Sequence, residues 1–231
     1  MSTLLLRLAG PLQAWGTESR FEVRDTDLEP SKSGVVGLVA AALGRRRDAD
    51  VSDLAALCMG VRVDREPVRI RDYHTVQNVA RVAGREARGG EDSTVVSERW
   101  YLADADFLVG LEGDRRLLEA IDAALRRPRF APTLGRRSCL PSLPVALPAE
   151  PPQGPLIREA GLEEALATYP WQVAQPGRGG PRALRTVIET SAGAGDAVRH
   201  DQPIGDAFHT RRFVSRWVRT GYVRAPLDEV A

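Results

Sequence analysis

The chain has 231 residues and 43% hydrophobic content, which is enough for one sizeable domain with a real core. Its net charge of +1 gives no overall attraction to nucleic acid, although Lys32 is the single lysine and the other 31 basic residues are arginines. No apolar stretch is long enough for a signal peptide or a membrane span, which predicts a cytoplasmic protein. The two cysteines and three histidines lack metal-ligand spacing, so neither a metal nor a cofactor is expected.

The first part of the chain predicts strands and helices in a mixed order. We expect strands at 3–9, 60–70, 100–102 and 107–111, and helices at 31–43, 52–59 and 114–127, the last capped by Asp114 and stopped by Pro128. This order is typical of a split βαβ or ferredoxin-like unit, an α+β fold that RNA-recognition modules also use. Fold alone does not assign a function.

The remaining segments are less regular. Residues 79–97 are polar and glycine-rich, as expected for a projecting hairpin. Six prolines between Pro141 and Pro155 predict an extended connection. Beyond it we expect a short helix at 162–169, strands at 182–189 and 213–218, and loops at 174–182 and 191–203.

The start of the helix at 31–43 has an unusual composition. Ser31 or Ser33 can cap it and Gly44 can end it. Gly34 and Gly37 lie in its first turns, where each glycine costs about 1 kcal/mol relative to alanine. Free N–H groups, hydroxyls and Lys32 together could bind a phosphate. The alternative is a plain cap whose glycines fit the helix against a sheet.

Two arginine-rich runs could bind a polyanion. Residues 126–137 carry five arginines and no acidic residue, and residues 209–224 interleave arginines with Phe213, Trp217 and Tyr222. Arginine suits bidentate phosphate contacts and stacking on bases. A bias of the genome toward GC-rich codons is the competing explanation. Similarly, Trp15 could stack on a base or cover the core.

One set of residues has the ingredients of catalysis. His74 could take a proton from a 2′-hydroxyl, and Lys32 or Tyr73 could stabilise the charged transition state of a metal-independent RNA cleavage. A histidine that only forms a hydrogen bond is the alternative. The chain has no P-loop and no Gly-x-Gly-x-x-Gly after a strand.

Four motifs give the chain a resemblance to a known family. They are Leu-Ala-Gly-Pro-Leu-Gln-Ala-Trp-Gly at 8–16, Pro-Ser-Lys-Ser-Gly-Val-Val-Gly-Leu at 30–38, Arg-Asp-Tyr-His-Thr-Val at 71–76, and Leu-Gly-Arg-Arg-Ser-Cys at 134–139. In this order they resemble the CasD family, the subunit of the type I-E CRISPR Cascade complex that holds the 5′ handle of the guide RNA. The resemblance implies a ferredoxin-like, RNA-recognition-motif-like domain at 1–147, a β-hairpin thumb at about 76–97, and a β-rich or irregular segment at 148–231 packed on it.

The resemblance also implies a function and a set of residues. We expect a non-catalytic subunit of an antiviral ribonucleoprotein that binds and caps the guide RNA (crRNA) 5′ handle; the alternative is an endoribonuclease that processes precursor guide RNA. Its expected partners are crRNA, the backbone and large Cascade subunits, and target DNA through the assembled complex, with no membrane. The expected RNA-binding residues are Gln13, Trp15, Lys32, Ser33, Arg71, Tyr73, His74, Arg136 and Arg137. For the alternative, the catalytic residues are Lys32, Tyr73 and His74.

Overall fold

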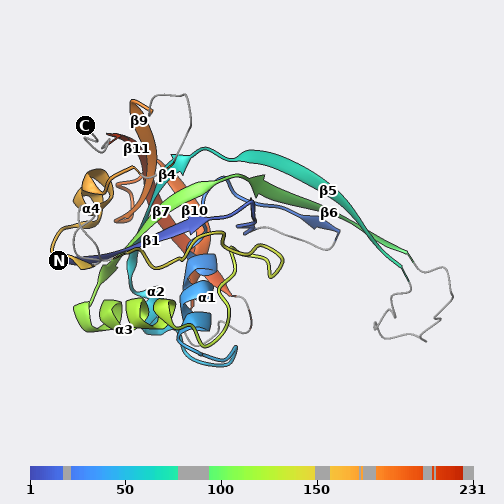
Figure 1. The fold of residues 1–231 in the computed structure, drawn as a ribbon, viewed down its shortest axis with the longest axis horizontal. Coiled ribbons are helices and arrows are strands. Elements are labelled where there is room, and N and C mark those ends of the chain that lie inside the picture. The colour runs from blue at the N-terminus through green and yellow to red at the C-terminus, as the bar shows by residue number, and fades with distance from the viewer. Residues whose placement is uncertain are drawn as a thin grey trace.

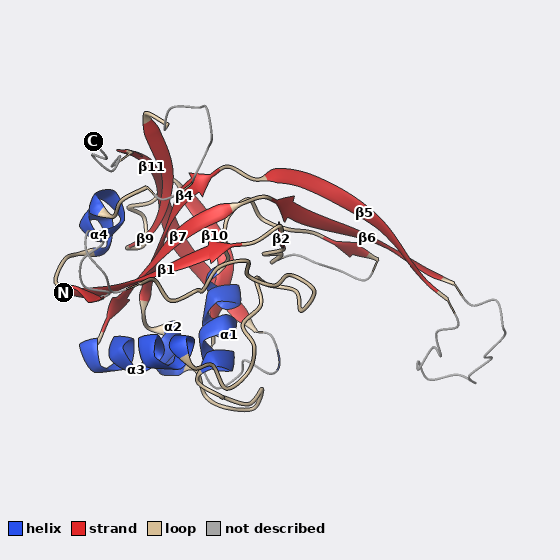
Figure 2. Ribbon diagram, viewed as in Figure 1, coloured by secondary structure: helices blue, strands red, loops and turns tan. Residues whose placement is uncertain are grey.

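A computed structural model of the chain describes residues 1–17, 22–77, 94–148, 157–171, 173, 181–204, 210 and 212–225. Two β-sheets and the helices beside them form the body, and one long hairpin projects from it (Figures 1 and 2). The mixed α+β class expected from the sequence is confirmed.

The larger sheet has seven strands in the order β10-β11-β9-β4-β7-β1-β8, and every neighbouring pair is antiparallel. The strands are β1 (Ser2–Ala9), β4 (Cys58–Arg65), β7 (Asp106–Gly113), β8 (Ile157–Arg158), β9 (Ala183–Thr190), β10 (Ala197–Pro203) and β11 (Phe213–Arg224). The C-terminal strands β9 to β11 therefore extend the same sheet, because β9 pairs directly with β4.

Helices cover both faces of this sheet. Because side chains alternate along a strand, Leu4 and Leu6 of β1 join the larger hydrophobic core while Leu5 joins a smaller one on the other face. The larger core takes residues from α1 (Lys32–Ala42), α2 (Ser52–Ala55) and α3 (Arg115–Arg126), and the smaller one from α4 (Leu162–Thr168). In Figure 1, α1, α2 and α3 lie together below the sheet, and α4 lies on its own.

The smaller sheet is built around β6. On one side β6 (Val95–Ala103) pairs antiparallel with β5 (Val68–Val76) along nine residues. It also pairs with the short strands β2 (Leu12–Gln13) and β3 (Val23–Arg24). The hairpin of β5 and β6, here called the thumb stem, extends far from the body (Figure 1). It starts earlier than the thumb expected at 76–97, and residues 78–93 of that range lie outside the described residues.

Several local predictions can be compared with the structure. The side chain of Asp114 accepts a hydrogen bond from Leu117 N at 3.0 Å, which confirms the predicted cap of α3. Gly44, with φ of +77°, follows α1 as predicted. The loop predicted at 191–203 was wrong, because residues 197–203 form β10. The sequence of this segment is polar and did not indicate a strand, because the strand forms by pairing with β11, which lies further along the chain.

Among the described residues, no helix is both long enough and apolar enough to cross a membrane. Nor does any group of three or more His, Cys, Asp or Glu side chains there have the arrangement to hold a metal ion.

Candidate nucleic-acid interface

Gln13 and Trp15 are buried, with 0% and 1% of their surface exposed. The indole Nε1 of Trp15 donates to Oε1 of Gln13 at 2.9 Å, and Nε2 of Gln13 donates to the carbonyl oxygens of Leu8 and Ala105, both at 2.9 Å. The polar side-chain groups of the pair are thus used inside the protein. The prediction that these two side chains line an RNA-binding surface is corrected: they hold the end of β1 to the core.

Trp15 also explains the glycine in the first turn of α1. A Cβ atom at Gly34 would lie 2.8 Å from Cε3 of Trp15, closer than real Cβ contacts. The backbone of Trp15 holds a second segment, because its N–H donates to Oγ1 of Thr26 at 2.8 Å and its carbonyl accepts from Asp27 N at 3.4 Å. Of the two explanations for Gly34, the close fit of the helix is therefore the one that the structure supports.

Lys32 lies at the start of α1 and has only 2% of its surface exposed. Its Nζ is 2.9 Å from both carboxylate oxygens of Glu189, and its backbone N–H donates to Oδ2 of Asp201 at 2.6 Å. Arg216 completes the cluster, with Nε 2.6 Å from Oδ1 of Asp201. The positive end of the helix thus already faces a carboxylate of the same chain.

This arrangement corrects the predicted phosphate site at the start of α1. Lys32 neutralises Glu189 in the interior, and the half-buried Ser33 follows it on the helix. Glu189 and Asp201 belong to β9 and β10, more than 150 residues further along the chain, so the pattern around Lys32 could not reveal them.

The thumb stem carries an exposed cluster of arginine and aromatic side chains. The register pairs Arg71 with Trp100 and Tyr73 with Glu98, so alternate residues of β5 share one face with Trp100. On this face Cζ of Arg69 lies 4.6 Å and Cζ of Arg71 6.0 Å from the centre of the Trp100 ring. Tyr73 is 65% exposed. We call Arg69, Arg71, Tyr73 and Trp100 the Trp100 platform.

The opposite face of the thumb stem is different. His74 lies there, and its Nδ1 is 3.4 Å from Oδ2 of Asp72. Tyr101 lies on the same face, and Cζ of Arg136 is 4.7 Å from the centre of its ring. The structure therefore separates His74 from Arg71 and Tyr73, which were expected on one surface.

Arg136 fixes the loop at 134–139 beside the base of the thumb stem. Its Nη2 donates to the carbonyl oxygen of Arg24 at 2.7 Å and to that of Asp25 at 3.3 Å. Arg137, next to it, is exposed. The carboxylate of Asp25 pairs with Arg69 of the Trp100 platform. One short segment thus connects the platform to the loop.

Gly135 anchors the same loop to the body. The N–H of Ala14 donates to Leu134 O at 3.1 Å, and Leu134 N donates to Cys139 O at 2.8 Å. Gly135 has φ of +87°, and a Cβ atom there would overlap the carbonyl oxygen of Ala14. The motif at 134–139 therefore needs glycine for its backbone and presents Arg136 and Arg137 at the surface.

The residues of the predicted nuclease are not assembled. Lys32 is buried under the larger sheet, whereas Tyr73 and His74 lie on the projecting thumb stem and on opposite faces of it. Figure 1 shows α1 and the outer part of β5 well apart. Sequence reasoning missed Arg69 and Trp100. The alternation Arg-x-Arg-x-Tyr at 69–73 would have indicated that Arg69 shares a face with Arg71 and Tyr73, whereas Trp100 joins them only through the pairing of β5 with β6.

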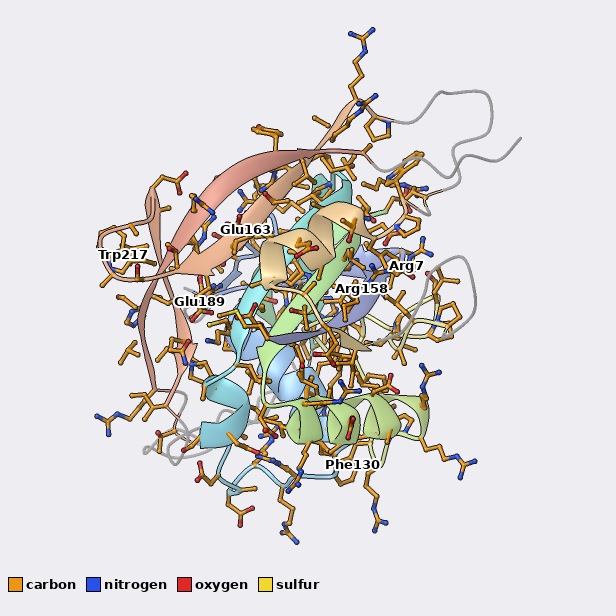
Figure 3. All side chains as sticks on the ribbon, turned by 90° about the vertical axis from the view of Figure 1, so that its left-hand side faces the viewer. Arg7, Phe130, Arg158, Glu163, Glu189 and Trp217 are labelled. Carbon is orange, nitrogen blue, oxygen red and sulfur yellow. The ribbon has the colours of Figure 1, made fainter. Side chains whose placement is uncertain are left out.

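Acidic side chains neutralise some arginines of both arginine-rich runs. Arg126 pairs with Asp122, and Arg216 is buried beside Asp201. Arg219 pairs with Glu163 of α4. In Figure 3, Glu163 is labelled beside α4 and Trp217 at the outer part of the sheet. Neighbouring acids thus neutralise much of the second run.

These features define an α+β protein with a projecting hairpin whose base exposes arginine and aromatic side chains. The model of the family described as CRISPR-associated protein (Cas_Cas5) matches residues 3–219, and the chain belongs to this family. The resemblance inferred from the four motifs is thereby confirmed.

Named relatives agree with this assignment. The chain is 39% identical over 155 residues to "CRISPR system Cascade subunit CasD" of Escherichia coli (strain K12), a match over 60% of this chain and 66% of that protein. The match thus spans slightly less than two thirds of that relative. Two solved structures are similar over 97% of the chain. One, "Crystal structure of Cas protein", has 46% identity, a TM-score of 0.74 and 98% of its own chain covered. The other, "CRISPR RNA-guided surveillance complex", has 33% identity, a TM-score of 0.77 and 91% covered.

Proposed function

We propose that the chain is a non-catalytic subunit of a type I-E CRISPR surveillance ribonucleoprotein, Cascade, and that it binds and caps the 5′ handle of the guide RNA. The observation that carries this proposal is the Trp100 platform on one face of a projecting hairpin, with Arg136 over Tyr101 on the other face and the exposed Arg137 next to it. The similarity to a Cascade subunit and to a chain of a surveillance complex supports it.

The fold supports the same proposal. Within the larger sheet, β4, β7, β1 and β8 are neighbours in that order, all antiparallel, with α1 between β1 and β4 and α3 between β7 and β8 in the chain. This is the strand order of a ferredoxin-like β-α-β-β-α-β unit. RNA-recognition modules use such a sheet to hold single-stranded RNA. In this protein the thumb stem is inserted between β4 and β7.

The exposed side chains have suitable chemistry for RNA. Arginine binds phosphate with a planar, bidentate fork and also stacks on flat rings. Arg69 and Arg71 already lie over Trp100, so their guanidinium groups are ordered before any ligand arrives. Aromatic residues next to basic ones favour unpaired bases over duplex, because every base has a face that can stack.

The arrangement favours binding over cleavage. A metal-independent endoribonuclease would need Lys32 near Tyr73 and His74, but Lys32 is paired with Glu189 in the interior. We therefore expect purified protein incubated with precursor repeat RNA in EDTA to give no product above background. A product that disappears in the His74→Ala variant would instead establish the endoribonuclease.

The proposal also names partners. As a Cascade subunit the chain would contact crRNA, the adjoining backbone subunit and the large subunit, and it would meet target DNA only through the assembled complex. The segment formed by residues 24–27 and the loop at 134–139 would hold the handle, and the thumb stem would extend toward the next subunit.

The test compares two double variants of the full chain. Arg136→Ala with Arg137→Ala removes both arginines of the loop, and Arg46→Ala with Arg47→Ala removes two exposed arginines elsewhere as a matched control. Charge-assisted hydrogen bonds contribute about 1.5–3 kcal/mol each, so the first variant should bind a labelled handle RNA at least about tenfold more weakly. The control should bind almost as wild type does.

The salt dependence of RNA affinity provides a second test of the same surface. Each phosphate contact to single-stranded RNA contributes about 0.7 to the slope of log affinity against log salt, so loss of two contacts should reduce the slope by about 1.4. Unchanged affinity and slope in the variant of Arg136 and Arg137 would rule out the proposed surface.

A further inference from the structure

The strand β5 has a long free edge. Among the described strands it pairs only with β6, and this pairing runs without a register shift from Val68 to Val76. Its nine residues exceed the usual strand length of about 5–6 residues, and they include neither proline nor glycine. Figures 1 and 2 show β5 along the border of the projecting hairpin, clear of the body. A free edge of this kind is open to pairing with another strand.

The charged side chains of β5 protect this edge poorly. Edge strands often carry charges that keep other strands away. Here Cζ of Arg69 and Cζ of Arg71 lie 4.6 and 6.0 Å from the centre of the Trp100 ring. Nη1 of Arg71 is also 3.7 Å from Oε1 of Glu98. Both ring and carboxylate belong to β6, so the two guanidinium groups lie away from the free edge.

The same strand exposes apolar side chains. The exposed fractions of Val68, Ile70, Tyr73 and Val76 are 63%, 39%, 65% and 40%. Cross-strand pairs between β-branched and aromatic side chains stabilise sheets. A second strand laid beside β5 would therefore find apolar partners as well as backbone hydrogen bonds.

The sequence of β5 is complementary to itself in one antiparallel register. When two identical strands pair around a two-fold axis, the axis passes through one residue, because directly opposed side chains lie on the same face of the sheet. With the axis at Tyr73, Ile70 lies opposite Val76 of the second copy, and Asp72 lies opposite His74 of the second copy. The first pair is apolar, and the second can form a hydrogen bond or an ion pair. Symmetry produces each pair twice.

Neighbouring registers lack this match. An axis at Arg71 or at Asp72 places two like charges directly opposite each other, which destabilises a strand pair. An axis at Ile70 places Arg69 opposite Arg71 of the second copy. An axis at His74 leaves Asp72 without a polar partner. The axis at Tyr73 is therefore the favoured one.

We propose that two copies of this chain dimerise through β5, antiparallel and with the two-fold axis at Tyr73. The paired segments, residues 70–76, span about 24 Å at about 3.4 Å per residue, and backbone hydrogen bonds join the two hairpins into one continuous sheet. A standard interface has about 20–30 residues on each side, so a contact of this length forms a weak dimer that depends on protein concentration. The pairing needs no RNA, and the protein alone forms it.

The first test measures the mass of the full chain by sedimentation equilibrium between about 1 and 100 µM. Wild type should change from one chain toward two over this range. His74→Glu places a carboxylate opposite Asp72 of the second copy, twice in each dimer, and should weaken the dimer about tenfold. Asp72→Lys should weaken it as well, because the pair with His74 is lost. Asp48→Lys changes an exposed carboxylate of the body and is the matched control, with the wild-type dissociation constant.

A mixture of the two weakened variants should recover the dimer. When one copy carries Asp72→Lys and the other His74→Glu, the introduced lysine faces the introduced glutamate, and the native aspartate faces the native histidine. An equimolar mixture should therefore associate more strongly than either variant alone.

Disulfide formation tests the register. In a Cys58→Ser background, which removes the exposed native thiol, Tyr73→Cys brings two thiols together at the axis. The Cα atoms of directly opposed residues lie about 4.5–5.5 Å apart, a distance that a disulfide can bridge. Oxidised glutathione should link this variant into covalent dimers. Thr75→Cys in the same background should not be linked, because residue 75 faces Arg71 of the second copy.

Three results would overturn the proposal. A wild-type protein that stays monomeric at every concentration would leave the edge to a different protein. A dimer that His74→Glu does not weaken would form through another surface. Equal disulfide linking of Thr75→Cys and Tyr73→Cys would show that the strands pair in another register.

Discussion

At the scale of single residues, the burial of Lys32 carries a large desolvation cost. Its ammonium group has left water and is compensated by Glu189, while Asp201 binds its backbone and Arg216. A buried ion pair offsets its desolvation only when both partners are present. The start of α1, where the sequence suggested a phosphate, is thus a structural joint between the helix and two C-terminal strands.

Replacement of Lys32 alone should therefore lower the stability of the protein strongly. Lys32→Met leaves Glu189 with the guanidinium of Arg216, whose Nη1 is 3.7 Å away, and with the backbone N–H of Met59, which donates to its Oε2 at 3.2 Å. We expect a loss of about 3 kcal/mol in the free energy of unfolding, measured by urea denaturation. The double variant with Glu189→Met should recover part of this loss, because no uncompensated charge remains. Equal stability of the single variant and wild type would contradict the role of the pair.

The burial of Lys32 should also make the stability of the protein depend on pH. Burial lowers the pKa of Lys32 below its ordinary value, although Glu189 opposes this. Between the lowered and the ordinary lysine pKa, the unfolded chain binds more protons than the folded one, so this residue's contribution to stability rises with pH in that alkaline window. The stability of wild type relative to Lys32→Met should therefore increase as pH rises through it. If urea denaturation instead shows that the free energy of unfolding of wild type falls relative to that of Lys32→Met over this range, Lys32 stays charged in the fold.

At the scale of elements, the loop at 134–139 links Ala14, which follows β2, with the segment at 24–27 and the thumb stem. Gly135 lets it approach Ala14, and Arg136 reaches both the carbonyl oxygen of Arg24 and the ring of Tyr101. The loop thus has two roles, because it presents Arg136 and Arg137 and also supports the base of the hairpin.

Gly135→Ala tests the loop without a change of charge. The added Cβ combines a positive φ with an overlap of the backbone of Ala14, so we expect a loss of at least about 2 kcal/mol in thermal or urea unfolding, together with weaker RNA binding. Gly193→Ala is the control. Gly193 has φ of +80°, but a Cβ atom added there would meet no other atom within 4 Å, so only the conformational cost of about 1–2 kcal/mol applies. Similar losses in both variants would mean that the contact with Ala14 is unimportant.

Local patterns in the sequence predicted local structure well. The cap at Asp114, the stop at Gly44 and the first strand follow from residues close to one another. The partners of Lys32 could not be predicted, because Glu189 and Asp201 meet it only through the pairing of distant strands. The burial of Trp15 depends on Gly34 in the same way. The exposed Arg137 and the half-buried Arg136 remain candidates because their motif forms a loop.

At the scale of the whole molecule, the C-terminal part completes the fold. β9 covers the edge of β4, β9 and β10 supply the acids that neutralise Lys32 and bind the start of α1, and α4 covers the second face of the sheet. Arg62 adds a further tie, since its buried guanidinium donates to the carbonyl oxygens of Leu166 and Tyr169 at 2.5 and 2.6 Å. The expected domain at 1–147 lacks all of these contacts.

A chain that ends at residue 147 should therefore not fold by itself. It would expose the edge of β4 and the apolar face under α4, and both features favour aggregation. We expect no cooperative thermal transition and self-association in size-exclusion chromatography. A chain that ends at residue 225 keeps every described strand and is the control, with stability close to wild type. A cooperative, monomeric fragment of 1–147 would establish it as an independent domain.

The thumb stem is attached to the body at its inner part, and its outer end projects away from the body (Figure 1). Its nine paired residues span about 30 Å at about 3.4 Å per residue. Besides the pairing of β6 with β2 and β3, two side-chain contacts brace the stem, Arg69 with Asp25 and Tyr101 with Arg136. A rotation of about 5° at the base would shift the outer end of the paired strands by about 2.6 Å over this length. Because the segment at 24–27 binds both Arg69 and Arg136, we expect a ligand that orders this segment to restrict the direction of the hairpin as well.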